Sequence, residues 1–363
     1  MIGVYIHIPY CRTICPYCDF VKRPTKGAVP SEFIAALSRE IEAYEGPREA
    51  DAIFFGGGTP SLIAPESLES ILSLVRRVFA VQPGAELTLE ANPDDVTAEL
   101  LDSWIALEVN RVSLGVQSFN DAALQYLGRR HDAESARGAC ALVAERFTNW
   151  NIDLMFGVPP YDAWRASLAE CACIGSPHVS AYGLTYEAGT PFGKRANEAI
   201  DDEAYLTQYK DCLELLSGVD RYEVSNYARR GFECVHNLHY WRNEEYAGFG
   251  PGAYSFLNGV RARNHVKLES YLEDPCGKSE SLALSEEEVR VETVIQHLRL
   301  RDGISRASYF RRFQRHLDDD FGGSIRALTA AGLLLDDRDS IVPTDKGFDL
   351  NNEIGLALVS VPA

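Results

Sequence analysis

Positive charge is scarce in this chain, and long apolar runs are missing. Its 363 residues include 35 lysines and arginines against 53 aspartates and glutamates, which gives a formal net charge of −18. A protein this acidic repels phosphate backbones, so we expect no nucleic-acid partner. No apolar stretch approaches the ~20 residues that cross a bilayer, and the N-terminus has no basic and apolar signal pattern. The sequence therefore predicts a soluble protein without a transmembrane segment.

Internal repeats, low-complexity tracts and paired-cysteine motifs of the C-x2-C…C-x2-C type are also missing. Apolar residues make up 46% of the chain and charged residues 24%, which is ordinary for a globular protein. The nine cysteines cannot all pair in disulfides, and nothing else suggests secretion. Free thiols and the missing signal pattern predict a reducing, cytoplasmic location.

Three closely spaced cysteines near the N-terminus are the most informative feature that is present. A β-rich run at residues 4–8 leads into Cys11, Cys15 and Cys18, with the spacing C-x3-C-x2-C. Thiolates on one loop suit zinc or an iron–sulfur cluster. Zinc would need a fourth ligand such as His7 or Asp19, and inert core thiols are the simplest alternative. A four-iron cluster held by three cysteines would leave one iron open to a small molecule.

A regular alternation of strands and helices fills the first two hundred residues. The predicted strands lie at residues 4–8, 52–55, 87–90, 111–116, 152–156 and 178–184. Helical patterns between them include residues 31–44, 65–79 and 98–107, with Ser31 and Thr97 as predicted N-caps. This order predicts a parallel α/β sheet with right-handed crossovers. Six units favour a partial barrel, although an open doubly wound sheet has the same composition.

Polar motifs follow the predicted strands in a consistent way. They lie at residues 11–18, 56–61, 90–93, 117–120, 153 and 182–185, each in or just beyond the C-terminal half of a strand. Ligands bind at that end of the strands in parallel α/β folds. The sequence therefore predicts one site at the carboxyl edge of the sheet.

The pattern changes after about residue 190. Residues 201–219 form an amphipathic pattern with Leu206, Tyr209, Leu213 and Leu216 on one side, and residues 222–227 are a further predicted strand. Residues 248–253 are a glycine- and proline-rich loop, and residues 268–284 are a predicted connection. Residues 286–361 are mostly helical, typical of a small winged-helix-like module or of a helical lid. We therefore divide the chain into 1–190, 191–284 and 285–363.

The chemistry of several single residues suggests a role for each of them. Gly56, Gly57 and Gly58 follow the second strand and let a ligand approach the backbone, although an ordinary turn uses the same residues. Glu90 ends an apolar strand, where a carboxylate is costly to bury without a partner. His7 is predicted to be a buried hydrogen-bonding residue. The cysteines predicted to be packing thiols are Cys140, Cys171, Cys173, Cys212 and Cys276.

The cysteine motif resembles that of the radical S-adenosylmethionine (radical SAM) superfamily. Tyr17 precedes the last cysteine as an aromatic residue does in that superfamily. The run from Tyr5 to Tyr10 narrows the resemblance to oxygen-independent coproporphyrinogen III oxidases and their heme-chaperone relatives. The resemblance implies a six-unit partial (β/α) barrel that binds a 4Fe-4S cluster on Cys11, Cys15 and Cys18. It also implies electron transfer from the cluster to SAM, giving methionine and a 5′-deoxyadenosyl radical.

The same resemblance assigns a SAM site. Gly57, Gly58 and Thr59 match the stretch whose carbonyl groups accept from the SAM amino group. The polar residues that match the lining of that site are Glu90, Gln117, Arg129 and Asp153. Tyr5 and Tyr17 match aromatic positions beside the cluster. Carboxylates suit ribose hydroxyls, and a guanidinium suits the methionine carboxylate.

Two departures separate this chain from the oxidases of the branch. Those enzymes carry a fourth cysteine two residues after the third, where this chain has Phe20, and they have a longer N-terminal segment. The chain most resembles the heme chaperones of the branch, the HemW group. Residues 236–241 fit the H-N-x-x-Y-W pattern of that group, and His236 becomes the expected heme ligand, with His239 or Cys234 as weaker alternatives.

The resemblance therefore implies a protein that binds cluster, SAM and heme and passes heme to an acceptor protein, with a separate electron donor. The alternatives are an oxygen-independent coproporphyrinogen III dehydrogenase, a radical SAM methyltransferase or heme-modifying enzyme, and a cluster-bearing scaffold without turnover. Whether SAM cleavage belongs to the working cycle is left open.

Overall fold

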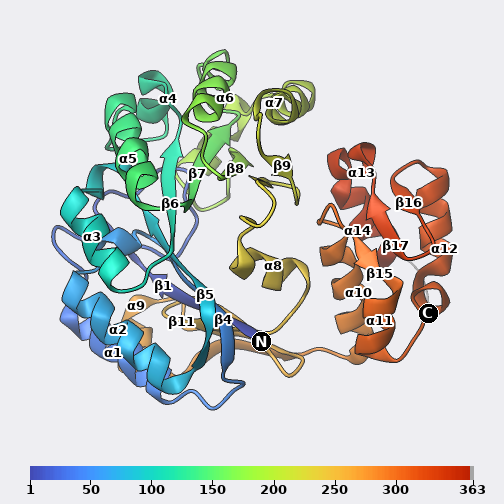
Figure 1. Cartoon of the computed structure of the whole chain (residues 1–363), viewed down its shortest axis with the longest axis horizontal. Helices are drawn as coiled ribbons and strands as arrows, with labels where there is room; N and C mark the ends of the chain where they lie inside the picture. The colour runs from blue at the N-terminus through green and yellow to red at the C-terminus, as the bar shows by residue number, and fades with distance from the viewer. Residues whose placement is uncertain (360–363) are drawn as a thin grey trace.

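A mixed sheet of 12 strands curves into an incomplete barrel at the centre of the computed structural model, which describes residues 1–359 (Figure 1). Its six parallel βα units confirm the predicted partial barrel. Their strands are β1 (Ile2–Ile8), β4 (Glu49–Gly57), β5 (Ala80–Ala91), β6 (Arg111–Gln117), β7 (Asn149–Phe156) and β8 (His178–Gly183). The helices are α1 (Ser31–Glu42), α2 (Pro65–Val78), α3 (Ala98–Ala106), α4 (Asp121–Tyr126), α5 (Ala133–Arg146), α6 (Ala163–Ile174) and α7 (Asp202–Leu215).

The two edges of this parallel region are extended by later parts of the chain. β11 (Tyr246–Phe249) pairs parallel with β1 and is followed by antiparallel β12 (Tyr254–Leu257), β13 (Val260–Asn264) and β14 (Lys278–Ala283). At the other edge, β10 (Asn226–Ala228) and β9 (Asp220–Arg221) pair antiparallel beyond β8. The barrel stays open between these edges, and Figure 1 shows α8 (Val235–Trp241) in that opening. α8 packs against β1 and β4.

The two faces of the parallel strands carry different residues. The outer face is apolar: Val4, Ile6 and Ile8 of β1 are fully buried in one core with α1 and α2. The inner face is polar, with Arg111 and His178 buried on β6 and β8. Parallel strands covered on both sides usually read as continuous apolar runs. A buried polar interior is therefore a feature that packing alone does not require, and it marks the inside of this barrel as a binding space.

The C-terminal unit has a separate apolar core. Its helices are α10 (Glu286–His297), α11 (Arg306–Phe313), α12 (Leu317–Ala330), α13 (Asp345–Asp349) and α14 (Asn351–Val359). Its small antiparallel sheet contains β15 (Ile304–Ser305), β16 (Leu334–Asp336) and β17 (Ser340–Pro343) in the order β15-β17-β16. The unit lies beside α8 in Figure 1, and the backbone N–H of Arg301 donates to the Tyr222 carbonyl at 2.8 Å. It thus sits near the amino ends of the strands, away from the cysteine loop.

The helix starts show one correct and one wrong prediction. The Thr97 hydroxyl accepts from the backbone N–H of Leu100 at 3.2 Å, so Thr97 is the N-cap of α3 as predicted. Ser31 is wrong as an N-cap: Pro30 occupies that position, and no side chain caps α1. Proline fixes an extended entry into the helix, so the hydroxyl of Ser31 falls inside the first turn.

Other details also differ from expectation. Leu213 was predicted on the buried side of α7 but is 46% exposed, because the helix turns that position outward. The connection at 268–284 contains α9 (Leu268–Glu273) and β14. The strand predicted at 222–227 forms only in part, as β10 starts at Asn226. Cys173 and Cys276 are exposed and so are not packing thiols.

Among residues 1–359, no helix combines the length and apolar character needed to cross a membrane.

Candidate functional site

The cysteine loop leaves the carboxyl end of β1. Cys11 belongs to β2 (Tyr10–Cys11), which pairs with β3 (Arg23–Pro24), and its carbonyl accepts from Thr25 N–H at 2.8 Å. The Cys18 N–H donates to the Cys15 carbonyl at 3.2 Å and closes a tight turn between these two cysteines. Cys11 is buried, and the other two are half-buried. All nine cysteines of the chain are free.

The three thiols form a suitable donor set for an iron–sulfur cluster. Burial raises the pKa of Cys11 and Cys18, and each of these thiols also feels the charge of Cys15. Within residues 1–359, no three His, Cys, Asp or Glu side chains converge closely enough to hold one metal ion. A cluster attaches each thiolate to a different iron, so it does not require three sulfur atoms to meet at one point. The loop therefore offers three sulfur ligands that a multi-iron group could share, one on each of three irons.

Arg129 brings a positive charge to this loop. Its Nη1 lies 3.6 Å from the Cys15 sulfur, and its Nη2 donates to Asn92 Oδ1 at 2.6 Å and to the Gly115 carbonyl at 2.7 Å. These two oxygen acceptors hold the guanidinium in place beside the Cys15 sulfur. Arg129 can thus serve both the sulfur end of the site and a carboxylate of a bound molecule.

The glycine stretch after β4 lies directly beside the loop. Gly57 adopts φ +110°, and a Cβ there would collide with the ring of His7. Gly58 N–H donates to the Ile8 carbonyl at 2.8 Å, and a Cβ at Gly58 would lie 2.7 Å from that same oxygen. Both positions require glycine because β1 and β4 approach closely here. The following Thr59 hydroxyl accepts from Asn92 Nδ2 at 3.3 Å.

Two carboxyl groups face the inside of the barrel. Burial and the nearby Asp153 raise the pKa of Glu90 to about 8, although the Gly57 N–H donates to its Oε2 at 3.0 Å. Burial also raises the pKa of Asp153, which accepts from Asn151 Nδ2 at 2.7 Å and from Ser113 Oγ at 3.3 Å. Two neighbouring carboxyl groups whose pKa values are both raised by burial indicate a binding site.

The remaining residues predicted to bind SAM lie near these two carboxyl groups or near the cysteine loop. Gln117 adopts φ +67° at the end of β6, and its amide and the Arg129 guanidinium both come close to Gly115. Tyr5 stacks on Phe54 with ring centroids 6.2 Å apart, and its hydroxyl bonds to His7 Nδ1 at 3.0 Å. His7 donates from Nε2 to the Val21 carbonyl at 2.8 Å, so it is a buried hydrogen-bonding residue as predicted. Tyr17 packs beside Phe192, 6.2 Å between ring centroids.

His236 does not join the cysteine loop. It is 1% exposed near the amino end of β1, where a Cβ at Gly3 would lie 2.8 Å from its Nδ1. Its ring stacks on Phe54 and Tyr5, with centroids 5.1 and 5.9 Å away, and its Nε2 bonds to the Tyr240 hydroxyl at 2.9 Å. Burial lowers the pKa of His236 to about 3. The histidine predicted to bind heme is thus enclosed in this arrangement.

The two alternative heme ligands, Cys234 and His239, already contact carboxylates of the protein. Cys234 is fully buried, its Sγ lies 3.4 Å from Glu86 Oε1, and burial raises its pKa to about 12. His239 contacts Asp51 at 2.7 Å and Glu244 at 2.9 Å. Burial opposes its charge, but these two carboxylates raise the pKa of His239 to about 9.

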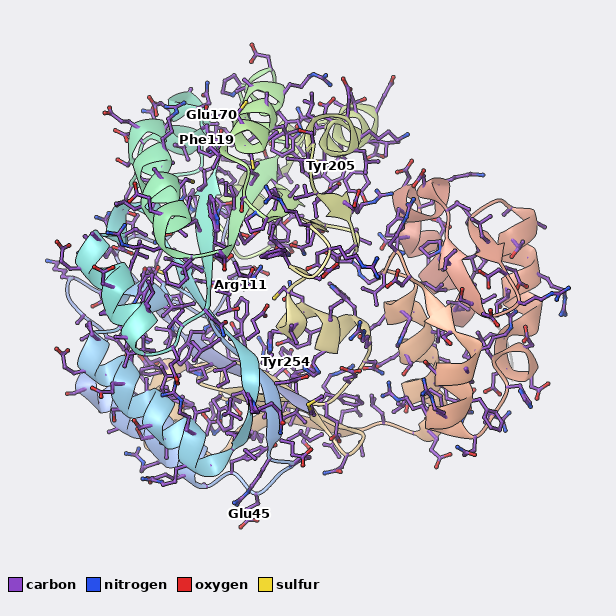
Figure 2. The ribbon with its side chains drawn as sticks, in the orientation of Figure 1. Glu45, Arg111, Phe119, Glu170, Tyr205 and Tyr254 are labelled. Carbon is purple, nitrogen blue, oxygen red and sulfur yellow. The ribbon has the colours of Figure 1, made fainter. Side chains whose placement is uncertain are left out.

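Sequence reasoning missed the polar floor of the barrel. Arg111 is 2% exposed and lies 3.8 Å from Glu86 Oε2, and Figure 2 shows it near the middle of the ring of strands. His178 donates from Nδ1 to Asn151 Oδ1 at 2.7 Å and accepts at Nε2 from the Tyr222 hydroxyl at 3.0 Å. The sequence did offer one indication of these buried polar residues, namely charged side chains inside β-rich runs. Charged side chains are rarely buried without partners.

Comparison with known proteins agrees with this geometry. Residues 5–170 match the Radical SAM superfamily, and residues 284–350 match the HemN C-terminal domain. The chain is 33% identical over 363 residues to a Lactococcus lactis protein named "Heme chaperone HemW", covering 97% of this chain and 96% of that one. A Bacillus subtilis protein of the same name is 32% identical over 373 residues, covering 98% of each.

The chain belongs to the HemW family.

Radical SAM membership implies a 4Fe-4S cluster and SAM as its cofactors, as the cysteine motif predicted. A further HemW, from Escherichia coli, is 39% identical over 262 residues, 70% of this chain and 69% of that one. Among solved structures, coproporphyrinogen III oxidase (HemN) from Escherichia coli superposes with a TM-score of 0.83 at 22% identity, over 99% of this chain and 90% of that one. At this identity the likeness to HemN concerns the fold alone.

Proposed function

We propose that this protein is a heme chaperone, which binds a 4Fe-4S cluster, SAM and heme and passes the heme to an acceptor protein. The observation that carries the proposal is the similarity to proteins named heme chaperones over 97% and 98% of the chain, both the barrel and the C-terminal unit included. Phe20 in place of the oxidases' fourth cysteine supports it, because a phenyl ring offers no metal ligand or redox group. Nine free thiols support a cytoplasmic location.

In this proposal Cys11, Cys15 and Cys18 hold the cluster. The group, with SAM bound, supplies one-electron chemistry at a carbon–sulfur bond. The guanidinium of Arg129, 3.6 Å from the Cys15 sulfur, would pair with the methionine carboxylate of SAM. The close approach of β1 and β4 at Gly57 leaves backbone oxygens as acceptors for an ammonium group.

The residues on the inside of the barrel bind the rest of the SAM molecule. Glu90 and Asp153, once ionised, would accept from the ribose hydroxyls of SAM, and its cationic sulfonium would lower the cost of their charge. Gln117, Tyr5 and Tyr17 would contact the bound SAM, and with Gly58 and Thr59 they would keep water away from it. His236 and its neighbours on α8 cover the other end of the barrel interior, near the amino end of β1.

Coproporphyrinogen III dehydrogenation is the competing function, since HemN shares the fold. Methylation or another modification of heme on the same scaffold is a further alternative. These activities differ from chaperone action in turnover, because a chaperone binds heme in a fixed ratio and leaves the tetrapyrrole unchanged.

The test is anaerobic reconstitution followed by two measurements. Hemin is titrated into the reconstituted chain, and SAM and reductant are then added with and without hemin while 5′-deoxyadenosine is quantified. We expect saturable, stoichiometric hemin binding with slow or absent SAM cleavage. Rapid 5′-deoxyadenosine formation coupled to loss of added coproporphyrinogen would overturn the chaperone function in favour of the dehydrogenase. A chain with Cys15→Ala serves as the cluster-deficient control.

A further inference from the structure

A large cleft lies between the barrel and the C-terminal unit. Its volume is about 1260 Å³, which exceeds that of typical small-molecule pockets. One wall comes from the segment of β9 through α8, and the other from α10, β15 and α11. The cleft is separate from the cysteine loop, since residues of that loop do not line it. We call it the interdomain cleft.

His297 lines this cleft and has the hydrogen-bond arrangement of a metal ligand. Its Nδ1 donates to the Thr293 carbonyl at 2.8 Å, one turn earlier in α10. This bond fixes the proton on Nδ1 and leaves the Nε2 lone pair available, and among residues 1–359 Nε2 has no hydrogen-bond partner. Metal-binding histidines commonly donate their second ring nitrogen to a carbonyl in this way. Burial, together with the charges of Arg312 and Arg242, lowers the pKa of His297 to about 4 and keeps the imidazole neutral.

Two arginines, Arg312 and Arg242, and one carboxylate, Glu244, act on His297 in the cleft. Arg230, Arg242 and Arg312 form no salt bridge within the described part of the chain. Arg312 donates instead to the carbonyls of Arg242 and Asn243, at 3.0 and 2.6 Å. Five arginines and five carboxylates line the cleft of a protein whose formal net charge is −18. Guanidinium groups without a salt-bridge partner suit carboxylates of a ligand.

The cleft also has apolar surface close to these cations. Leu238 of α8 lines it opposite Ile304 and Phe313 of the C-terminal unit. The Phe313 ring is half-buried and stands 4.8 Å from the ring of Tyr309. A flat, apolar macrocycle with two carboxylates and a central metal matches apolar walls, arginines and one free imidazole nitrogen together.

We propose that the interdomain cleft binds heme, with His297 Nε2 as an axial ligand of the iron and Arg242 as a partner of a propionate. This inference rests on the proposed heme-chaperone function and gives that function a site. This site also involves α8 in heme binding without using His236. Leu238 and Arg242 of that segment line the cleft, whereas His236 packs against β1 and β4.

The test uses the full reconstituted chain and ferric hemin. His297→Ala should weaken hemin binding about tenfold or more and change the absorption spectrum of the bound heme. Added imidazole should restore the spectrum, because it can enter the space left by the ring. The matched control is His316→Ala, an exposed histidine of the same C-terminal unit that does not line the cleft.

A second arm tests the charge contact without touching the iron ligand. Wild-type protein should bind hemin more tightly than hemin dimethyl ester, which lacks the propionate charges, and Arg242→Gln should remove most of that difference. Arg242 is exposed, so the substitution leaves the core intact.

The outcomes separate this inference from the function on which it rests. If wild-type protein binds no hemin, the chaperone function itself fails. If wild-type protein binds hemin but His297→Ala keeps the same affinity and spectrum, the site is wrong and the function stands. If His297→Ala loses affinity but imidazole does not restore the spectrum, His297 is not the iron ligand.

Discussion

Replacing Glu90 with glutamine should make the cofactor-free protein more stable at alkaline pH and weaken its binding of SAM. Glu90 sits inside the barrel, where burial and then Asp153 raise its pKa from 4.5 to about 8. The folded protein therefore retains a proton that the unfolded chain has already lost between these pH values. Stability consequently falls as the pH rises through this window. Glutamine keeps an acceptor for the Gly57 N–H but removes the charge.

The size of the effect follows from the pKa shift. One pKa unit corresponds to about 1.4 kcal/mol, so the shift from 4.5 to about 8 sets an upper limit of about 5 kcal/mol. Glu90 faces an open barrel and shares its environment with Asp153, which reduces the penalty that it carries alone. We expect Glu90→Gln to raise the free energy of unfolding by about 2 kcal/mol above pH 8 and by almost nothing near pH 4.

The assay is thermal or urea unfolding of the cluster-free chain across this pH range, followed by SAM binding to the reconstituted chain. Loss of a charged acceptor for a ribose hydroxyl should weaken SAM about tenfold. Glu69→Gln, on the outer surface of α2, is the control and should change neither quantity. Equal pH slopes for Glu90→Gln and wild type, together with unchanged SAM affinity, would refute the assignment of Glu90 to a strained binding site.

Three further predictions concern separate parts of the chain. Cys15→Ala should abolish the visible absorbance of the reconstituted cluster, and a variant that retains full absorbance would refute the ligand assignment. His236→Ala should lower stability by about 2–4 kcal/mol, since it removes a buried ring stacked on Phe54, as followed by unfolding. Hemin affinity and the cluster should both be unchanged in His236→Ala, since the structure encloses this ring and the proposed iron ligand is His297; weaker hemin binding with an intact cluster would instead support the sequence-based expectation that His236 binds heme. Thr97→Ala should cost about 1 kcal/mol by loss of the α3 cap, whereas Ser31→Ala should be close to neutral; equal effects would contradict the capping assignment.

Much of the barrel and of the cysteine loop could be predicted from the sequence, because both depend on local patterns. The six βα units follow from alternating β-rich and helical runs, and the cysteine spacing identifies its loop without any distant contact. Thr97 was predictable for the same reason, since an N-cap bonds only three residues ahead.

The features that sequence reasoning missed depend on residues that are distant in the chain. Arg111 looked like one polar residue in a strand, and its burial beside Glu86 becomes apparent only when β5 and β6 pair. His236 was the expected heme ligand, yet α8 folds into the barrel opening and stacks its ring on Tyr5. His297 belongs to no motif, and only the packing of the C-terminal unit beside α8 places it in a cleft.

The most direct test of the chaperone function is heme transfer. The reconstituted chain is loaded with one equivalent of heme, mixed anaerobically with the heme-free form of a b-type hemoprotein, and separated while the heme spectrum of each protein is recorded. We predict that heme leaves this chain and appears, chemically unchanged, in the acceptor in equal amount, with no consumption of coproporphyrinogen in a parallel incubation. Heme that stays on the chain while coproporphyrinogen is decarboxylated over many turnovers would contradict the account.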